Sequence, residues 1–417
     1  MRVVFLSTNQ TRGGAAIAAN RYFDAYCSVG GNAVYAPGSV QKPGPGIVSL
    51  RHSWPIRKLV KYLLKQERRK TLKLKIPNEG YWSAPVNSRF RSPKIRKLNP
   101  DLVCLNWIND DFLSIDEIGR FKVPVVWVFH DLWAVTGGCH YPGSCSGFYQ
   151  SCGNCPKLKY PGENDWSRQI WRKKYEAWNH LDMTILCPSN WMAREVKKSR
   201  LFGDKRIEVC PYSIETEIFK PMDSEAFREE LGIRPHQKVL LFGAVNSMHD
   251  TRKGAHLLVE ALEKLDGRID PDELVFMVFG AKESPALEKV PYRIINLGFV
   301  SEKEDLARYY AASTAFVLPS LEDNLPNTVL ESLSCGTPVV AFDIGGISDM
   351  IDHGDNGLLV KRVDTSLLAD ALETLVKMPA DRYGTMQKAS RKKIEDHFSR
   401  EVVGQKLKEI FSSVVSE

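Results

Sequence analysis

The residues best suited to chemistry lie in the segment 317–351, where two apolar runs are each followed by the expected start of a helix. The helix after the first run is predicted to end at Gly336, because glycine commonly terminates helices. The second run, 339–342, meets Gly345 and Gly346, which can open another helix. A helix N-terminus presents N–H groups without intrahelical partners and the positive end of a dipole. The segment therefore predicts a site for phosphate or sugar oxygens.

Two carboxylates stand beside this predicted anion site. Asp323 and Glu331 are separated by seven residues, so one precedes the helix and the other lies near its first turns. Carboxylates add nothing to a site that binds phosphate alone, but they accept hydrogen bonds from hydroxyl groups. The combination indicates a ligand that carries both phosphates and hydroxyl groups.

The segment resembles the donor-binding motif of retaining glycosyltransferases of family 4, in which two glutamates flank a seven-residue spacer. In that family the first acid binds hydroxyls of the donor sugar and the second binds the ribose diol. Glu331 holds the second position here, and the first falls to Asp323 or to Glu322 before it. Further donor-binding residues that the resemblance implies in this segment are Asn324, Pro326, Asn327 and Thr328.

Two basic residues precede another predicted helix of the C-terminal half. Arg252 and Lys253 stand before Gly254 at a strand-to-helix turn, where cations suit a diphosphate. The Lys-Gly pair matches that of the family, whereas the family's earlier Arg is missing, so Arg252 is the candidate to replace it. Gly298 and Phe299 resemble the family region that packs on the nucleotide base.

The N-terminal half alternates predicted strands and helices, as a doubly wound domain does. After the first strand, Gly13 and Gly14 allow a ligand to approach the backbone closely. The predicted strand 125–129 delivers His130 to its carboxyl end, where ligands bind in such sheets. Family members place a matching His over the donor sugar, so the resemblance implies that role for His130.

Four cysteines fall within seventeen residues of this half, at Cys139, Cys145, Cys152 and Cys155. The stretch 130–164 shows no helix or strand period, and a loop of this length usually needs an additional stabilising link. Structural zinc bound by four thiolates is the preferred interpretation, with His140 able to replace one ligand. A redox pair, a labile iron–sulfur site and plain buried thiols are the alternatives. The loop resembles that of a family 4 branch found in capsule, colanic-acid and O-antigen synthesis, and it is expected to shape the acceptor pocket.

The composition of the 417 residues, 43% hydrophobic and 26% charged, is that of a soluble globular protein with two or three domains. No apolar run reaches membrane-spanning length or resembles a secretory signal, so we expect a cytoplasmic protein with reduced cysteines. Residues 1–200 hold 31 Lys/Arg against 14 Asp/Glu, or +17, and the remainder holds 26 against 36, or −10, which sum to +7. This asymmetry predicts two domains with different partners.

Much of the positive charge lies in the segment 51–75, which carries ten Lys/Arg and one acid, Glu67. Its apolar residues recur at helical spacing, with Trp54 at one end. Such a helix is typical of an element that lies on a membrane and attracts anionic lipids or the pyrophosphate of a lipid-linked acceptor. A helix that covers its own domain and has a solvated basic face is an equal alternative. Nucleic acid is a weaker option, because no recognition motif accompanies the charge.

The resemblance covers nearly the whole chain and implies the GT-B fold, an α/β architecture of two Rossmann-like doubly wound domains facing a central cleft. Residues 1–212 would form the acceptor-binding domain, with the cysteine-rich loop at 133–160. A linker at 213–222 would lead to the nucleotide-sugar-binding domain at 223–398. The segment 399–417 would form a helix that crosses back to the first domain.

The function implied is that of a retaining hexosyltransferase that uses a UDP- or GDP-sugar donor and a glycan or lipid-linked acceptor. The resemblance implies a role in polysaccharide or lipopolysaccharide biosynthesis. The protein would act in the cytoplasm or on the inner face of the cell membrane. No carboxylate pair is placed for double displacement. The resemblance implies a front-face mechanism, in which a departing phosphate oxygen takes the acceptor's proton. No Asp-x-Asp ends a strand, so neither a catalytic metal nor another cofactor is expected. The alternatives are a nucleotide-sugar epimerase or hydrolase of the same fold, and a non-catalytic protein that binds sugar nucleotides or lipids.

Overall fold

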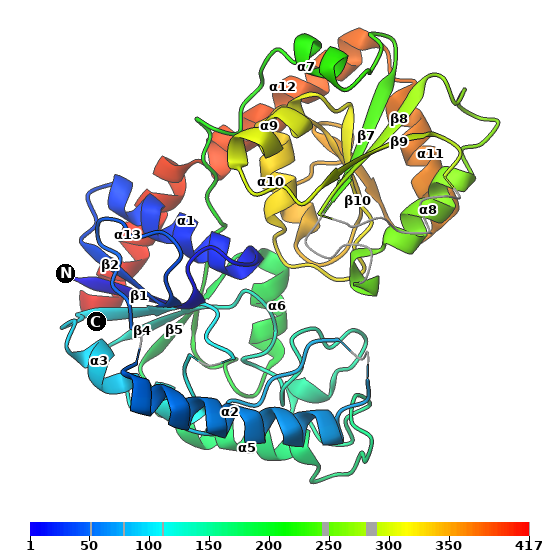
Figure 1. Cartoon of the computed structure of the whole chain (residues 1–417). Helices are drawn as coiled ribbons and strands as arrows, with labels where there is room; N and C mark the ends of the chain where they lie inside the picture. The colour runs from blue at the N-terminus through cyan, green and yellow to red at the C-terminus, as the bar shows by residue number, and fades with distance from the viewer. Residues whose placement is uncertain (51, 78–79, 111, 244–249, 281–289, 417) are drawn as a thin grey trace. The chain divides into compact units, whose positions relative to one another are not determined.

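The computed structural model describes residues 1–50, 52–77, 80–110, 112–243, 250–280 and 290–416. The chain divides into two compact units (Figure 1). The N-terminal unit comprises Met1–Pro211 and Val403–Glu417, and the C-terminal unit comprises Tyr212–Val402. Arg51, the first residue of the predicted basic segment, lies outside the described residues.

The N-terminal unit is built on six parallel strands in the order β2-β1-β3-β4-β5-β6. Most of them are apolar runs buried on both faces, as expected where helices cover both sides of a parallel sheet. The strand order reverses between β1 and β3, so a doubly wound sheet is expected to bind ligands at the carboxyl ends of these strands. The strands are β1 (Val3–Asn9), β2 (Ala33–Ser39), β3 (Leu102–Leu105), β4 (Val125–Val128), β5 (Met183–Cys187) and β6 (Arg206–Val209).

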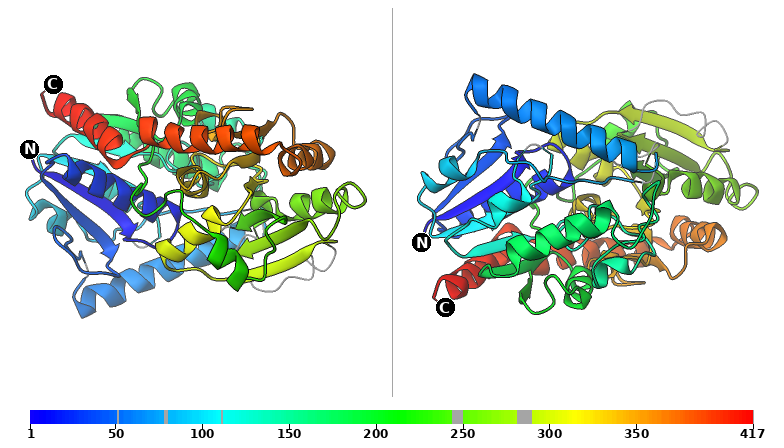
Figure 2. Two further views of the ribbon diagram at one scale, coloured as in Figure 1. Left: turned by 90° about the horizontal axis from the view of Figure 1, so that it is seen from above. Right: turned by 90° about the horizontal axis from the view of Figure 1, so that it is seen from below.

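Helices lie on both sides of this sheet, with α1 and α13 on one side and α2 and α5 on the other (Figures 1 and 2). Local sequence explains several helix starts: Asp165 caps α5 by accepting hydrogen bonds from the N–H groups of Ser167 and Arg168. The helices are α1 (Gly14–Ser28), α2 (Trp54–Leu74), α3 (Ser92–Arg96), α4 (Ile115–Ile118), the 3₁₀ turn η1 (Gly147–Tyr149), α5 (Trp166–Trp178), α6 (Asn190–Lys198) and α13 (Arg400–Ser416).

The last helix, α13, packs on the first strand and helix of the chain. The ring of Phe411 meets those of Phe5 and Tyr26 at centroid distances of 5.8 and 5.2 Å. Gly404 lies so close to α1 that a Cβ atom there would be 2.2 Å from the carbonyl oxygen of Ala25. Apolar packing and this close approach therefore fix α13 on the N-terminal unit.

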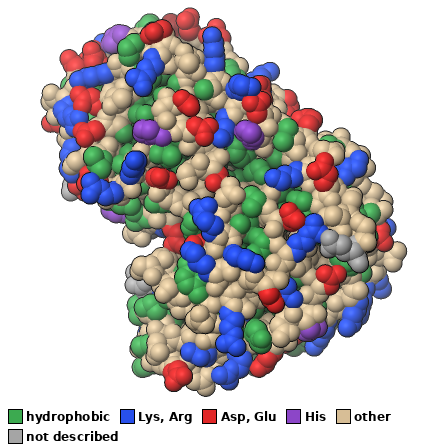
Figure 3. Space-filling view, turned by 180° about the vertical axis from the view of Figure 1, so that it is seen from behind, with side chains coloured by type: hydrophobic (Ala, Val, Ile, Leu, Met, Phe, Trp, Pro, Cys, Tyr) green, Lys and Arg blue, Asp and Glu red, His purple; other side chains and the backbone are tan. Residues whose placement is uncertain are grey.

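The helix α2 carries much of the basic segment and is largely exposed. It buries Val60 but leaves Trp54, Tyr62 and Leu72 at 68%, 60% and 73% exposure. Figure 3 views the molecule from behind, the side away from α2, and shows that Lys and Arg side chains are also present on that face of the N-terminal unit. Among the described helices, none is long and apolar enough to cross a membrane.

The C-terminal unit contains a second sheet of six parallel strands, in the order β12-β11-β10-β7-β8-β9. Its order reverses between β7 and β10, which pair directly. The strands are β7 (Lys238–Gly243), β8 (Leu274–Phe279), β9 (Arg293–Gly298), β10 (Ala315–Leu318), β11 (Val339–Phe342) and β12 (Gly357–Val360). The helices and 3₁₀ turns are α7 (Glu225–Glu230), η2 (Thr251–Lys253), α8 (Ala255–Glu263), α9 (Lys303–Ala311), α10 (Asn327–Ser334), η4 (Ile347–Asp349), α11 (Thr365–Val376) and α12 (Ala380–His397). The predicted α/β class with two Rossmann-like sheets is confirmed.

The segment 317–351 follows its sequence-based prediction in one part and departs from it in another. The helix α10 ends at Ser334, and Gly336 takes the left-handed φ of 74° that such a terminus favours. The helix predicted to open after Gly346 is instead the three-residue turn η4. The connection 343–356 between β11 and β12 contains this turn in place of the expected helix.

Candidate functional site

The acids and bases predicted in the C-terminal unit meet after the carboxyl ends of β7 and β10, where the strand order reverses. The Lys253 ammonium lies 2.7 Å from Oδ2 of Asp323, and the Ser320 hydroxyl lies 3.2 Å from the same oxygen. Asp323 is 8% exposed. Burial alone would raise its carboxyl pKa, but the nearby cations Lys253 and Arg252 lower that pKa below its ordinary value. Asp323 is therefore ionised at neutral pH and is held by a cation.

Arg252 holds the turn that carries these acids. Its guanidinium donates to the carbonyl oxygen of Glu322 and to the carboxylate of Asp250, each at 2.9 Å. Its own carbonyl oxygen accepts a hydrogen bond from the N–H of Leu321 at 2.8 Å. The structure thus brings Arg252, Lys253, Glu322 and Asp323 together, as the resemblance implied.

Two glycines allow the loops at this site to touch. Gly254 has a φ of 71°, and a Cβ atom there would lie 1.8 Å from the carbonyl oxygen of Pro319. Gly345 has a φ of 58°, and a Cβ atom there would lie 1.9 Å from the carbonyl oxygen of Asp323. Only glycine combines this left-handed backbone with such a close approach. The two contacts fix the loop after β10 between its neighbours.

The second acid, Glu331, lies on α10 and is 5% exposed. Its Oε2 accepts a hydrogen bond from the hydroxyl of Tyr310 at 3.3 Å. The helix starts after Pro326, which has no polar side chain to cap the first turn. Asn324 is buried close to this start, whereas Asn327 and Thr328 are half-buried in the first turn. The predicted residues of this helix therefore lie directly after the turn that holds Asp323.

The predicted base-packing residues lie at an edge of the sheet. Gly298 ends β9 with a φ of 64°, and Phe299 is 76% exposed. Two strands, β7 and β8, separate β9 from β10 in the strand order. Within the described part of the chain, no contact joins these residues to the Lys253–Asp323 pair.

The glycines of the N-terminal unit precede α1, at the carboxyl end of β1. Gly13 is the residue before the helix and has a φ of 94°. A Cβ atom at Gly13 would find nothing within 4 Å among the described residues, so the space beside the helix start is open. Gly14 is the first residue of the helix. This position agrees with close approach of a ligand to the backbone.

His130 follows β4 and is buried, with 7% exposure. Its Nε2 lies 3.1 Å from the amide oxygen of Asn106, which accepts a hydrogen bond from the ring N–H. Burial lowers the pKa of His130 to about 4, although Asp131 acts in the opposite direction. The ring is therefore neutral at physiological pH and acts as a hydrogen-bond donor to Asn106.

The low pKa of His130 predicts a pH dependence of stability. Because the unfolded chain protonates this ring near its ordinary pKa of 6.5, the free energy of unfolding should fall as the pH drops from 6.5 to 4. The loss attributable to His130 should reach about 3 kcal/mol. We expect the free energy of unfolding, measured with urea at several pH values, to change less steeply with pH in His130→Gln than in the original chain. His236→Gln, at a 54% exposed side chain, is the control. Equal slopes for His130→Gln and the original chain would contradict this prediction.

Several polar residues near His130 were not predicted as a set. Oδ2 of Asp131 lies 2.7 Å from Nδ1 of His140 and accepts a hydrogen bond from the indole of Trp107 at 3.1 Å. Nε2 of His140 lies 2.8 Å from the hydroxyl of Ser83. Both ring nitrogens of His140 have hydrogen-bond partners, which favours the four thiolates over His140 as the predicted metal ligands. The His-Asp dipeptide is visible in the sequence, but no local pattern connects Ser83 with it.

The four cysteines of the loop line one small cavity, together with Trp82 and Phe148. All four are free thiols, and the N–H of Gly137 donates to Sγ of Cys152 at 3.1 Å. The buried ammonium of Lys174 interacts electrostatically with Cys152 and Cys139. Among the described residues, no three His, Cys, Asp or Glu side chains form a group that could hold a metal ion. Structural zinc therefore stays a prediction.

Metal analysis of the purified full chain tests the zinc prediction. We expect about one zinc ion per chain, because four thiolates are a usual structural zinc set. Cys152→Ser should lose the metal and lower the thermal midpoint, whereas Cys27→Ser, which changes a half-buried thiol outside the loop, should keep it. A folded chain that contains no zinc would refute the prediction.

Comparisons with known proteins agree with this architecture. Residues 47–218 match the family model described as Glycosyltransferase Family 4, and residues 237–378 match the model described as Glycosyl transferases group 1. Each unit thus contains a region that resembles a glycosyltransferase family. Its fold is the GT-B fold of two Rossmann-like domains.

The sequence relatives match part of the chain. The D-inositol 3-phosphate glycosyltransferase of Frankia alni is 32% identical over 190 residues, which cover 42% of this chain and 45% of that protein. The protein of the same name from Nocardia farcinica is 30% identical over 184 residues, which cover 41% and 40% of the two chains. The matches thus span less than half the length of these curated relatives.

The structural relatives match the whole chain. Sucrose-phosphate synthase of Thermosynechococcus elongatus aligns with a TM-score of 0.70 at 15% identity and covers 100% of this chain and 99% of its own. HepE of Anabaena, solved in complex with UDP-glucose, aligns with a TM-score of 0.65 at 16% identity. The alignment covers 99% of this chain and 100% of the HepE chain. At these identities the likeness establishes the fold.

Proposed function

We propose that the protein is a retaining glycosyltransferase that moves a hexose from a nucleotide-diphosphate donor to a glycan acceptor. The observation that carries the proposal is the Lys253–Asp323 pair beside the start of α10, at the reversal of strand order in the C-terminal unit. Such a position suits a ligand with phosphates and hydroxyl groups. The two glycosyltransferase domain matches and the UDP-glucose bound by HepE support a nucleotide-sugar donor.

Each charged group then has a role in binding the donor. Lys253 and Arg252 neutralise the diphosphate as it leaves with additional negative charge. Glu331 binds the ribose diol, and Asp323 or Glu322 binds hydroxyls of the hexose. His130 lies against the reacting sugar as a neutral ring whose N–H is bonded to Asn106. In this mechanism a phosphate oxygen of the leaving group takes the acceptor's proton, without a catalytic metal or other cofactor.

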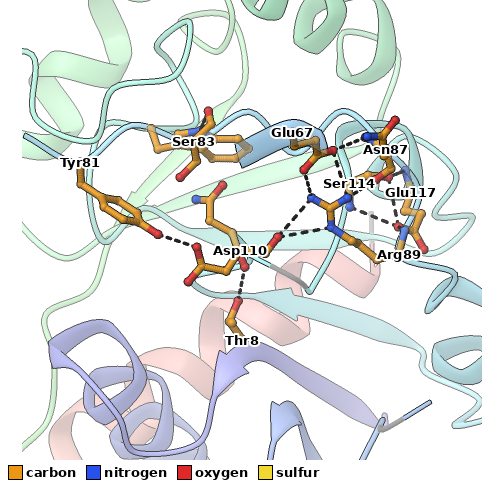
Figure 4. A network of polar contacts seen from close by, with 11 residues as sticks. Thr8, Glu67, Tyr81, Ser83, Asn87, Arg89, Asp110, Ser114 and Glu117 are labelled. Carbon is orange, nitrogen blue, oxygen red and sulfur yellow. Dashed lines mark hydrogen bonds and ion pairs between the residues drawn. The ribbon is translucent and has the colours of Figure 1, made fainter. Parts of the chain in front are cut away.

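The acceptor and its location are part of the same proposal. The exposed aromatic and basic surface of α2 suits an anionic membrane that would present a lipid-linked glycan of surface polysaccharide synthesis. In the structure Glu67 of α2 pairs with the buried Arg89, which anchors the helix to its own unit (Figure 4). We expect the full chain to bind anionic phosphatidylglycerol vesicles more strongly than phosphatidylcholine vesicles, and the binding to phosphatidylglycerol to depend on Trp54. Equal binding to both kinds of vesicle would indicate that α2 only covers its own domain.

A thermal-shift screen against UDP, GDP, ADP and their hexose conjugates tests donor binding. A ligand selective for the native state raises its stability, so one base series should increase the thermal midpoint of the full chain. In Glu331→Ala, the ligand concentration that gives half of the maximal shift should rise at least about tenfold, because two hydroxyl contacts are lost. The absence of a shift with every nucleotide would overturn the proposal. An epimerase or hydrolase would consume the donor in the absence of acceptor, whereas a binding protein would release no nucleoside diphosphate.

A further inference from the structure

A chain of polar groups in the N-terminal unit lies outside the proposed donor-binding residues. We name it the Tyr81 cluster, and its members are Asp131, His140, Ser83, Tyr81 and Asp110. Asp131 lies 2.7 Å from His140, which lies 2.8 Å from the Ser83 hydroxyl. At the other end, the Tyr81 hydroxyl donates to Oδ1 of Asp110 at 2.5 Å (Figure 4).

The hydrogen-bond partners determine where the protons of this cluster lie. Asp131 accepts from Nδ1–H of His140, and in this assigned tautomer Nε2 accepts the proton of Ser83. The proton of Tyr81 is directed at Asp110. Each of the two hydroxyl oxygens can therefore accept a hydrogen bond from a ligand.

The surroundings of the two oxygens suit a sugar. Tyr81 is 48% exposed, whereas His140 behind it is 1% exposed. The Tyr81 ring lies 4.6 Å from the ring of His140 and 6.1 Å from that of Trp107, which makes an aromatic surface beside polar acceptors. Such a combination of aromatic faces and a few placed polar groups is typical of small-molecule sites.

Asp110 is held in a strained conformation that directs its carboxylate at Tyr81. Its φ of 60° is left-handed, which is uncommon for a residue with a side chain. The carbonyl oxygen of Asp110 accepts from the buried guanidinium of Arg89 at 3.2 and 3.3 Å (Figure 4). Arg89 is paired in turn with Glu67. The ion pair thus fixes the backbone whose conformation carries the carboxylate, as is common at binding sites.

We propose that Tyr81, Ser83 and Asp110 form a binding subsite for a hexopyranoside, in which sugar hydroxyls donate to the oxygens of Ser83 and Tyr81 while the ring lies against Tyr81. His140 and Asp131 are positioning residues, because they direct the Ser83 proton inward. Identification of this sugar as part of the acceptor rests on the proposed glycosyl transfer, but the binding itself does not.

Saturation-transfer NMR with the full chain tests the subsite without a known acceptor. The probes are the methyl α-glycosides of glucose, galactose and mannose. We expect at least one of them to bind, and Tyr81→Phe to weaken that binding about fivefold through loss of one hydrogen bond. Ser83→Ala should act in the same direction. Tyr160→Phe is the matched control, because Tyr160 is a 74% exposed tyrosine of the same unit outside the cluster.

The outcomes separate this subsite from a structural network. Absence of binding by all three glycosides, or equal binding by Tyr81→Phe, would overturn the subsite, as would equal loss in Tyr160→Phe. Nitrogen-15 shifts of His140 should show the Nδ1–H tautomer, and Asp131→Asn should lose it together with glycoside affinity. If glycosides bind while no nucleotide raises the thermal midpoint, the subsite stands and the proposed transferase function fails. If a nucleotide raises the thermal midpoint while no glycoside binds, the subsite fails and the proposed transferase function stands.

Discussion

Lys253→Ala is expected to lower donor turnover at least about tenfold, since a preorganised cation beside a leaving diphosphate commonly contributes that much or more. The ammonium lies 2.7 Å from Asp323, so the positive charge is already in position before a donor binds. The measurement is release of nucleoside diphosphate by the purified full chain, with the nucleotide sugar that the thermal-shift screen selects. Lys264→Ala is the control, because Lys264 forms an exposed pair with Glu260 on α8 of the same unit.

The same substitution should also affect stability. Asp323 is 8% exposed, and removal of Lys253 leaves its carboxylate without this partner. Removal of one member of a buried pair usually costs a few kcal/mol, so the thermal midpoint should fall as well. The double variant Lys253→Ala/Asp323→Asn should recover part of that midpoint but not the turnover. Unchanged turnover in Lys253→Ala would reject the assignment of Lys253 to the diphosphate.

Sequence reasoning succeeded where the pattern was local. Apolar runs predicted the strands β10 and β11, and Gly336 predicted the end of α10. These predictions were possible because strands and helix ends depend on a few neighbouring residues. Gly336 follows the end of α10 as expected and has a left-handed backbone. The family resemblance assigned Lys253 and Asp323 to one donor-binding site, and the contact of 2.7 Å between them came from the structure.

The remaining part of the site depends on contacts between distant segments. Ser83 and His140 are 57 positions apart, and their hydrogen bond forms where the segment between α2 and α3 meets the loop after β4. Tyr310 reaches Glu331 from the preceding helix of the unit. No period or spacing in the sequence encodes these pairs, because each member is an ordinary residue in its own segment. The helix expected after Gly346 is replaced by the turn η4, which shows that a Gly-Gly pair alone does not determine the element that follows it.

Gly254→Ala is expected to abolish the nucleotide-induced thermal shift. The left-handed φ of 71° disfavours any side chain, and the new Cβ atom would lie 1.8 Å from the carbonyl oxygen of Pro319. Relief of this overlap requires the turn carrying Lys253 to separate from the loop after β10. The displaced ammonium would no longer lie beside Asp323, so the proposed diphosphate site would be disrupted together with the packing.

Gly267→Ala separates the effect of backbone conformation from that of close approach. Gly267 has a φ of 72°, nearly the same as Gly254, but a Cβ atom there would find nothing within 4 Å among the described residues. We expect Gly267→Ala to cost about 1 kcal/mol of unfolding free energy and to keep the nucleotide response. Gly254→Ala should lose the response even at temperatures where its circular dichroism shows a folded chain. If both variants retained an equal response, contact between the two loops would not be required for donor binding.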